Sequence, residues 1–362
     1  MKVLIVRENY HPNILGIVHG LRAHGHHVEL LLNDPPRDSV RGIEGAPVQV
    51  EPLTPTSQRL ARRLGLKPPH VAWPSIKRTW RHIQSRDPDV VLLKKTRLPQ
   101  AVAGACAVLQ RKPRVVVTDR PLSRRGRVLQ RLGIVPRRHL TAGIDSDADL
   151  RNPQIRFLTY PAAELASAPP REGYRGPKLR VLCIGKFSSR RKRQQWLVEA
   201  VAMRGLQERV ELTFVGTWSD RGPETHDARE VIRARERDLD LPSSKVLTNL
   251  SWAEVQDLYQ HHDVHVLPAR DEPHGAVVTE AMAHGLVTVC SDTCGARGAF
   301  REGEGGFTFS TAEASSLGQV LEHLSNLSHE ELLSLQWRAL GEAQRSLDAK
   351  KWVREFESLV QG

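Results

Sequence analysis

The sequence has few cysteines, and they are not paired as metal sites or disulfide frameworks require. The four cysteines among the 362 residues are Cys106, Cys183, Cys290 and Cys294. Cys290 and Cys294 stand close together, but no second pair or nearby histidine pattern completes a zinc site. We therefore expect four reduced, mostly structural thiols in a cytoplasmic protein.

Long apolar runs are also missing from the sequence. No stretch approaches the ~18 residues of a membrane-spanning helix, and the apolar segment Val3–Val6 is too short for the core of a signal peptide. That segment predicts a first strand instead. Aromatic residues make up only 5% of the chain and do not alternate with its arginine-rich segments, so nucleic acid is not an expected partner.

Acidic residues are scarce in one part of the chain. Residues 59–138 contain 21 Lys or Arg and three acids, whereas the whole chain has a net charge of +12. Residues 56–70 and 122–138 interleave arginine with leucine, a pattern typical of a basic amphipathic surface on an anionic membrane. We expect peripheral contact with the inner face of the membrane there. A charged helix face exposed to water would give the same pattern, and both interpretations are open.

Short apolar runs alternate with helical patterns along most of the chain. This alternation is typical of an α/β protein with parallel sheets. Two separate series of strands predict two Rossmann-like domains, and ligands of such sheets bind beyond the carboxyl ends of the strands, here in a central cleft. The strands are expected at 2–6, 27–32, 89–93, 114–118 and 155–160, and then at 178–185, 209–216, 245–250, 263–269 and 286–292.

The two predicted domains are separated by a segment rich in proline and glycine. Residues 161–178, "PAAELASAPPREGYRGPK", have the composition of a linker. We therefore expect an N-terminal domain at 1–160 and a C-terminal domain at 179–345. Residues 346–362 are expected to form a final helix that packs back on the N-terminal domain.

One short segment places two glutamates in different settings. In "DEPHGAVVTEAMAHG", residues 271–285, Pro273 disfavours helical geometry at Glu272, and the small residues that follow predict a helix that begins near Gly275. Glu280 then lies on the second turn of this helix. Two exposed surface acids would give the same spacing, so the segment by itself does not establish a site.

A longer stretch around these glutamates resembles a known family. Residues 263–295, "DVHVLPARDEPHGAVVTEAMAHGLVTVCSDTCG", resemble the Glu-x7-Glu signature of retaining glycosyltransferases with the GT-B fold, in particular glycosyltransferase family four. Residues 181–200 resemble the family's first strand and basic phosphate-binding segment, and residues 16–31 resemble its opening helix and strand. The resemblance implies transfer of a sugar from a nucleoside diphosphate donor to an acceptor hydroxyl, with retention of configuration.

The same resemblance assigns the donor-binding residues. Lys186, Arg191 and Lys192 follow a strand end, where positive charge can hold a diphosphate, and Lys192 matches the family lysine better than Lys186 does. A solvated basic loop is the alternative interpretation. The amides of Gly275, Ala276 and Val277 are expected at a helix N-terminus, where unsatisfied N–H groups favour phosphate or sugar oxygens.

The two glutamates complete the expected site. By resemblance, Glu280 accepts hydrogen bonds from the ribose hydroxyls, and Glu272 lies at the donor sugar, where it stabilises or orients the reacting centre. The sequence does not decide whether Glu272 is a nucleophile. In the N-terminal domain, His11 is a candidate acid–base or acceptor-orienting residue, with plain polar surface as the alternative.

The reaction is expected to need no cofactor and no catalytic metal. Asp145 and Asp147 match a metal motif of another glycosyltransferase fold, but acids at this spacing occur freely by chance. The expected acceptor is a glycan or a lipid-linked molecule, in cell-envelope glycan or glycolipid synthesis. A nucleotide-sugar epimerase, a disaccharide synthase, and a non-catalytic glycan- or membrane-binding module with this fold are the alternatives.

Overall fold

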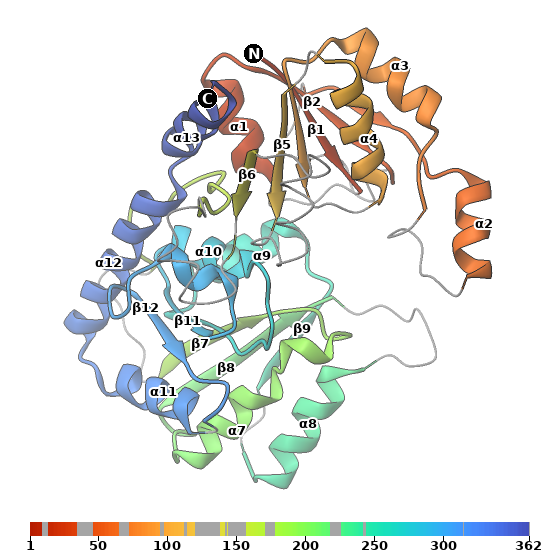
Figure 1. Ribbon diagram of the computed structural model, residues 1–362. Helices are drawn as coiled ribbons and strands as arrows, with labels where there is room; N and C mark the ends of the chain where they lie inside the picture. The colour runs from red at the N-terminus through yellow and green to blue at the C-terminus, as the bar shows by residue number, and fades with distance from the viewer. Residues whose placement is uncertain are drawn as a thin grey trace. The chain divides into compact units, whose positions relative to one another are not determined.

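The structure is a computed structural model that forms two compact units (Figure 1). The first comprises Met1–Ala142, Asn152–Ala163 and Ala349–Gly362, and the second comprises Gly143–Arg151 and Glu164–Asp348. The residues that it describes are 1–8, 14–34, 46–64, 72–94, 98–111, 114–119, 138–141, 143, 157–170, 178–217, 226–241, 244–313 and 315–361.

The first unit is built on a parallel six-stranded sheet with the order β3-β2-β1-β4-β5-β6. The strand at residues 2–7, in the interior of this sheet, is apolar on both sides, because Val3 and Ile5 pack into one core and Leu4 and Val6 into another. Such two-sided burial explains the uninterrupted apolar run in the sequence. The strands are β1 (Lys2–Arg7), β2 (His27–Leu32), β3 (Val48–Val50), β4 (Val90–Lys94), β5 (Arg114–Asp119) and β6 (Arg138–Thr141).

Helices cover both faces of this sheet (Figure 1). The helices α1 (Leu15–Ala23) and α13 (Ala349–Gln361) pack on one face, and α3 (Ile76–Arg86) and α4 (Leu98–Leu109) pack on the other. The rings of Trp352 and Phe356 stack 5.2 Å apart within the first of these cores. The last helix of the chain is therefore part of the core of the first unit.

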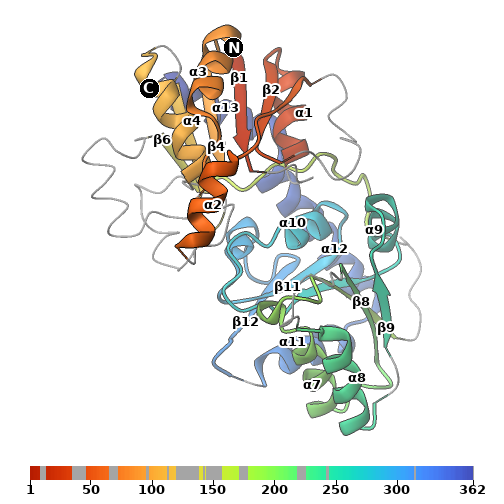
Figure 2. The same cartoon turned by 90° about the vertical axis from the view of Figure 1, so that its right-hand side faces the viewer.

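The second unit is built on another parallel six-stranded sheet, with the order β12-β11-β10-β7-β8-β9. Figure 2 shows α9 and α10 on one side of this sheet and α7, α8 and α11 on the other. The strands are β7 (Leu179–Ile184), β8 (Val210–Gly216), β9 (Lys245–Thr248), β10 (Val264–Leu267), β11 (Val287–Ser291) and β12 (Gly306–Phe309). The helices are α7 (Gln195–Met203), α8 (Ala228–Asp238), α9 (Trp252–Tyr259), α10 (Ala276–Ala283), α11 (Ser316–Asn326) and α12 (His329–Leu347).

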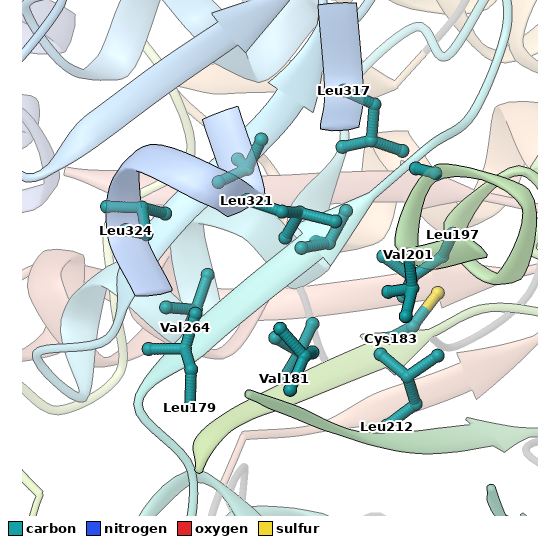
Figure 3. Packing of buried hydrophobic residues seen from close by; sticks show 14 of the residues in the cluster. Leu179, Val181, Cys183, Leu197, Val201, Leu212, Val264, Leu317, Leu321 and Leu324 are labelled. Carbon is teal, nitrogen blue, oxygen red and sulfur yellow. The ribbon is translucent and has the colours of Figure 1, made fainter. Parts of the chain in front are cut away.

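The larger core of the second unit lies between the sheet and α7, α8 and α11. Figure 3 shows side chains of α7 and α11, such as Leu197 and Leu321, directed toward those of the strands, such as Val181 and Val264. Cys183 lies in the same core, and all four cysteines of the chain are buried and free of disulfides. This core fixes the carboxyl ends of β7 and β10, from which the candidate site is built.

The structure confirms the predicted α/β class with two Rossmann-like sheets, but it differs in detail. The strand expected at 155–160 is wrong for its described residues, because Phe157 forms only an isolated bridge to Thr141 and residues 158–160 are not in a strand. The short strands β3, β6 and β12 were not expected. They are edge strands of three or four residues, and their segments VQV, RHLT and GFTF contain no run of apolar residues.

Candidate functional site

The candidate site lies where the strand order of the second sheet reverses. The first strand of this sheet, β7, pairs with β8 on one side and with β10 on the other. After β7 the sheet continues to β8 on one side, and after β10 it continues to β11 on the other, so the carboxyl ends of β7 and β10 form the switch point at which parallel α/β sheets bind ligands. The corresponding loops of the first unit, after β1 and β4, include residues 9–13 and 95–97, which lie outside the described residues.

A lysine from the first loop and a glutamate from the second form an ion pair. The Nζ atom of Lys192 lies 2.8 Å from Oε2 of Glu272, and the two side chains are only 14% and 10% exposed. Arg191 lies 3.6 Å from the same carboxylate. The backbones meet as well, because the amide of Arg270 donates a 2.9 Å hydrogen bond to the carbonyl of Arg191. The fold thus brings together two residues that are 80 positions apart.

The surroundings of Glu272 keep its carboxyl group ionised. Burial would raise its pKa, but the charge and hydrogen bond of Lys192, the charge of Arg191 and the amide of Gly275 outweigh burial and lower the pKa. The carbonyl of Glu272 also accepts a 2.8 Å hydrogen bond from the amide of Gly295. Since the pKa is lowered, the stability contributed by this carboxylate is present above its ordinary value and is lost as the pH falls.

Gly275 is required by the backbone at the start of α10. Its φ angle is +62°, and a Cβ atom there would lie 2.6 Å from the Sγ atom of Cys294. The requirement is local, because the turn into α10 packs against the segment after β11. The helix begins at Ala276, and the first amides of a helix have no acceptor within it, so those of Ala276 and Val277 can bind an anion.

Glu280 differs from Glu272 in its electrostatic surroundings. It is half-buried on α10, and burial raises the pKa of its carboxyl group to about 7, although the hydrogen bond from Tyr259 acts in the opposite direction. The hydroxyl of Tyr259 lies 3.3 Å from Oε2 of Glu280. The two acids of the segment therefore have pKa values pushed apart by their environments, an arrangement that is typical of functional sites.

Tyr259 is a residue of the candidate site that the sequence did not indicate. It is the last residue of α9, it is fully buried, and its ring stacks on that of His284 with the centroids 4.7 Å apart. His284 also contacts the carbonyl of Glu280 through Nδ1, at 2.8 Å. In the sequence, Tyr259 stands at an apolar position of a helix just before a strand, which indicates core packing. Its neighbours along the chain do not distinguish it from a core residue.

The other predicted residues lie apart from the ion pair or outside the described residues. Lys186 is exposed, and no ion pair of its side chain is found in the described part of the chain. His11, Asp145 and Asp147 lie outside the described residues. Among the residues that the structure describes, no group of three potential metal ligands comes together, and the expectation that no metal is needed stays a prediction.

The raised pKa of Glu280 predicts an unusual pH dependence of stability. The folded state binds a proton more tightly than the unfolded state between the ordinary carboxyl pKa and about 7, so stability is lost as the pH rises through that window. The Glu280→Gln variant should lack this loss, and its advantage over the wild type should grow to at most about 3 kcal/mol above pH 7. Urea unfolding of both proteins at acidic and alkaline pH measures the difference. An advantage that does not change with pH would contradict the assignment.

Comparison with known proteins identifies a domain in the second unit. Residues 178–326 match the family model described as glycosyl transferases group 1. This segment includes Lys192, Glu272 and Glu280. No curated protein matches the chain.

Solved structures resemble the whole chain in fold. A sucrose-phosphate synthase from Thermosynechococcus elongatus is 16% identical with a TM-score of 0.71, over 100% of this chain and 98% of that one. HepE from Anabaena, solved with UDP, is 15% identical with a TM-score of 0.70, over 100% of both chains. The lipopolysaccharide outer core galactosyltransferase WaaB is 15% identical with a TM-score of 0.67, over 99% of both. These likenesses confirm the GT-B fold, and with the family match they support a GT-B glycosyltransferase.

Proposed function

We propose that this chain is a retaining glycosyltransferase of the Glu-x7-Glu type, similar to glycosyltransferase family four. It moves a sugar from a nucleoside diphosphate donor to an acceptor hydroxyl in the synthesis of a cell-envelope glycan or glycolipid. The observation that carries the proposal is the buried Lys192–Glu272 ion pair at the carboxyl ends of β7 and β10. A nucleotide-sugar donor is also supported by the HepE structures, which contain UDP and UDP-glucose.

The donor would bind across the three parts of the candidate site. Lys192, with Arg191 and Lys186, would hold the diphosphate together with the first amides of α10, because cations and helix N-termini both attract phosphate oxygens. Glu280 would accept hydrogen bonds from the ribose hydroxyls. Tyr259 would hold the Glu280 carboxylate in place through the hydrogen bond described above.

Glu272 would act at the sugar. When the bond to the diphosphate breaks, the sugar becomes positively charged, and a carboxylate held ionised beside it stabilises that charge. At the same time the leaving diphosphate gains negative charge, which Lys192 neutralises. The ion pair present before the donor binds therefore contains both charges that the transition state requires.

Product analysis tests this function. Free nucleoside diphosphate should form only when donor and acceptor are both present, and the glycosidic bond of the product should keep the configuration of the donor. Interconversion of the donor sugar in the absence of an acceptor would favour an epimerase. Donor binding with no turnover on any acceptor would favour a non-catalytic module.

We also propose that the first unit attaches the enzyme to an anionic membrane. The helix α2 (Pro55–Arg63) carries Arg59, Arg62 and Arg63 on its exposed surface, beside Leu60 and Leu64, which are 44% and 62% exposed. In the described part of the chain, no helix has the length and apolar character to cross a bilayer. Exposed leucines next to arginines suit a helix that lies in the headgroup region.

Vesicle flotation tests the membrane proposal. Changing Arg59, Arg62 and Arg63 to Gln should remove up to ~3 kcal/mol of attraction to anionic vesicles, because each charge near such a surface contributes ~1 kcal/mol. Binding of the wild type should also weaken as salt rises, since exposed charges are screened over ~8 Å at physiological ionic strength. The matched control changes three exposed cations of α13, Lys350, Lys351 and Arg354, to Gln. Equal losses in both variants, or a wild type that ignores anionic vesicles at low salt, would contradict the proposal.

A further inference from the structure

A hollow in the second unit lies outside the candidate site. Along α12, the side chains of Trp337, Arg338 and Arg345 line a shallow groove of about 450 Å³, and Arg301 from the loop before β12 lies on its other side. Trp337 is a large aromatic residue that remains 43% exposed. We call this surface the α12 groove. The helix that carries it begins with a capping box, in which Ser328 and Glu331 satisfy N–H groups at its N-terminus.

A glycine forms part of the floor of the α12 groove. Gly341 lies one turn after Trp337 and one turn before Arg345, inside a 19-residue helix, where glycine is less stable than alanine. Close packing does not require a glycine here, because a Cβ atom at this position would meet no heavy atom within 4 Å. The consequence of this glycine is therefore an open notch between the tryptophan ring and the arginine.

Two arginines at the α12 groove are held in fixed positions by a buried acid. The carboxylate of Glu342, with a side chain only 2% exposed, accepts hydrogen bonds of 2.7 Å from Nη2 of Arg301 and 2.7 Å from Nη2 of Arg345. The two arginine side chains are nevertheless 67% and 43% exposed. Nε and Nη2 of both guanidinium groups are engaged by Glu342, so these two arginines attract a carboxylate, sulfate or phosphate by their fixed positive charge and not through a bidentate edge.

The third arginine is held only loosely. Nη1 of Arg338 lies 3.9 Å from Oε2 of Glu304, and both side chains are more than 40% exposed. Such a surface pair contributes little to stability, so Arg338 can turn toward a ligand at small cost. Three arginines against two glutamates make the lining of the groove net positive.

We propose that the α12 groove binds an acidic oligosaccharide. A sugar ring can stack its C–H face on Trp337 over the notch at Gly341, while the acidic group of the same or the next sugar pairs with the arginines. A lipid surface fits less well, because the lining contains no exposed aliphatic side chain. A nucleic acid strand fits less well too, because single-strand binding uses successive aromatic platforms and Trp337 is the one aromatic residue in this lining.

The fixed arginines persist over the physiological pH range. Burial would raise the pKa of Glu342, but the hydrogen bonds from Arg345 and Arg301 outweigh it and lower the pKa to about 2. The carboxylate therefore stays ionised at physiological pH, and binding of the glycan should not depend on its titration there.

Calorimetric titration with a short oligogalacturonate tests the proposal, with its methyl-esterified neutral form as the matched ligand. The acidic form should bind at low salt. The affinity of the neutral form should be lower by roughly tenfold or more, because the charge-assisted hydrogen bonds are lost. The Trp337→Ala variant should lose roughly five- to tenfold in affinity for the acidic form. Trp252→Ala removes another exposed tryptophan, on α9 and 53% exposed in the wild type, and should leave binding unchanged.

A second variant separates loss of binding from loss of folding. Gly341→Gln fills the notch with a good helix former, so its melting temperature should equal or exceed that of the wild type while oligogalacturonate binding falls. Wild-type affinity in both Gly341→Gln and Trp337→Ala would overturn the proposal, as would absence of binding by the wild type. Equal binding of the neutral form would exclude an acidic ligand. No nucleotide-sugar is present in these titrations, so the result does not depend on the proposed transfer reaction.

Discussion

Replacement of Lys192 by alanine should weaken the binding of a nucleoside diphosphate by roughly 10- to 150-fold, which corresponds to the loss of a hydrogen bond to a charged group. The affinity for the bare nucleoside should stay nearly unchanged, because a lysine that acts as a point charge contributes only where a phosphate is present. A thermal-shift screen of nucleotide-sugars first identifies the base, since a ligand at 100 times its dissociation constant stabilises the fold by roughly 2.7 kcal/mol. Calorimetric titration with that diphosphate and its nucleoside then gives the two affinities.

Two further variants make the Lys192 result specific. Arg190→Ala removes an exposed cation from the same short helical turn, so it measures the effect of general positive charge. In Lys192→Ala alone, Glu272 would remain buried without its cation. The double variant Lys192→Ala with Glu272→Gln removes this uncompensated charge. If Lys192→Ala weakens nucleoside and diphosphate equally, the lysine supports the second unit rather than the ligand.

The turnover rate of the Glu272→Gln variant should be lower by about 100-fold or more. This loss is comparable to that of one preorganised electrostatic contact in other enzymes. Donor affinity should fall much less, because the proposed contact strengthens only as the sugar gains positive charge. Donor affinity can even rise, since the neutral side chain introduced at position 272 does not hold Lys192 by charge, and the lysine can turn toward the phosphates. Steady-state rates with saturating donor, measured beside calorimetric donor titrations, separate the two effects.

Glu280→Ala provides the contrast for this experiment. It should weaken donor binding by ~1.5–3 kcal/mol, the range for a hydrogen bond to a charged group, and affect turnover at saturation less than Glu272→Gln does. Small and equal effects of the two substitutions would mean that Glu272 and Glu280 support the fold of the second unit rather than bind the donor. That result would contradict the proposed donor site while leaving the GT-B fold unaffected.

Local patterns in the sequence were sufficient to predict the setting of the two glutamates. Pro273 excludes helical geometry at Glu272, and the small residues after Gly275 favour a helix, so the start of α10 near residue 275 follows from neighbours in the chain. The contact between Lys192 and Glu272 could not be predicted in this way. It depends on β7 and β10 lying side by side, and only the folded sheet determines that pairing.

The residues that the sequence did not reveal are those whose role depends on distant neighbours. Tyr259 looks like an ordinary core residue until α9 and α10 bring its hydroxyl to Glu280. The strand β12 begins at Gly306, in a segment with a glycine-rich composition that favours turns, and it forms because β11 offers a parallel partner from Thr288 to Ser291. In both cases a tertiary contact overrides or completes what the local pattern indicates.

The position of α13 in the core of the first unit has a consequence for the order of folding during synthesis. Trp352, Val353, Phe356 and Val360 are buried against strands that are made more than 200 residues earlier. The second unit contains all of its core residues before α13 leaves the ribosome, whereas the first unit must wait with only α1 on the face of its sheet that α13 later helps to cover. We therefore expect the usual order, in which the N-terminal domain folds first, to be reversed or at least delayed in this chain.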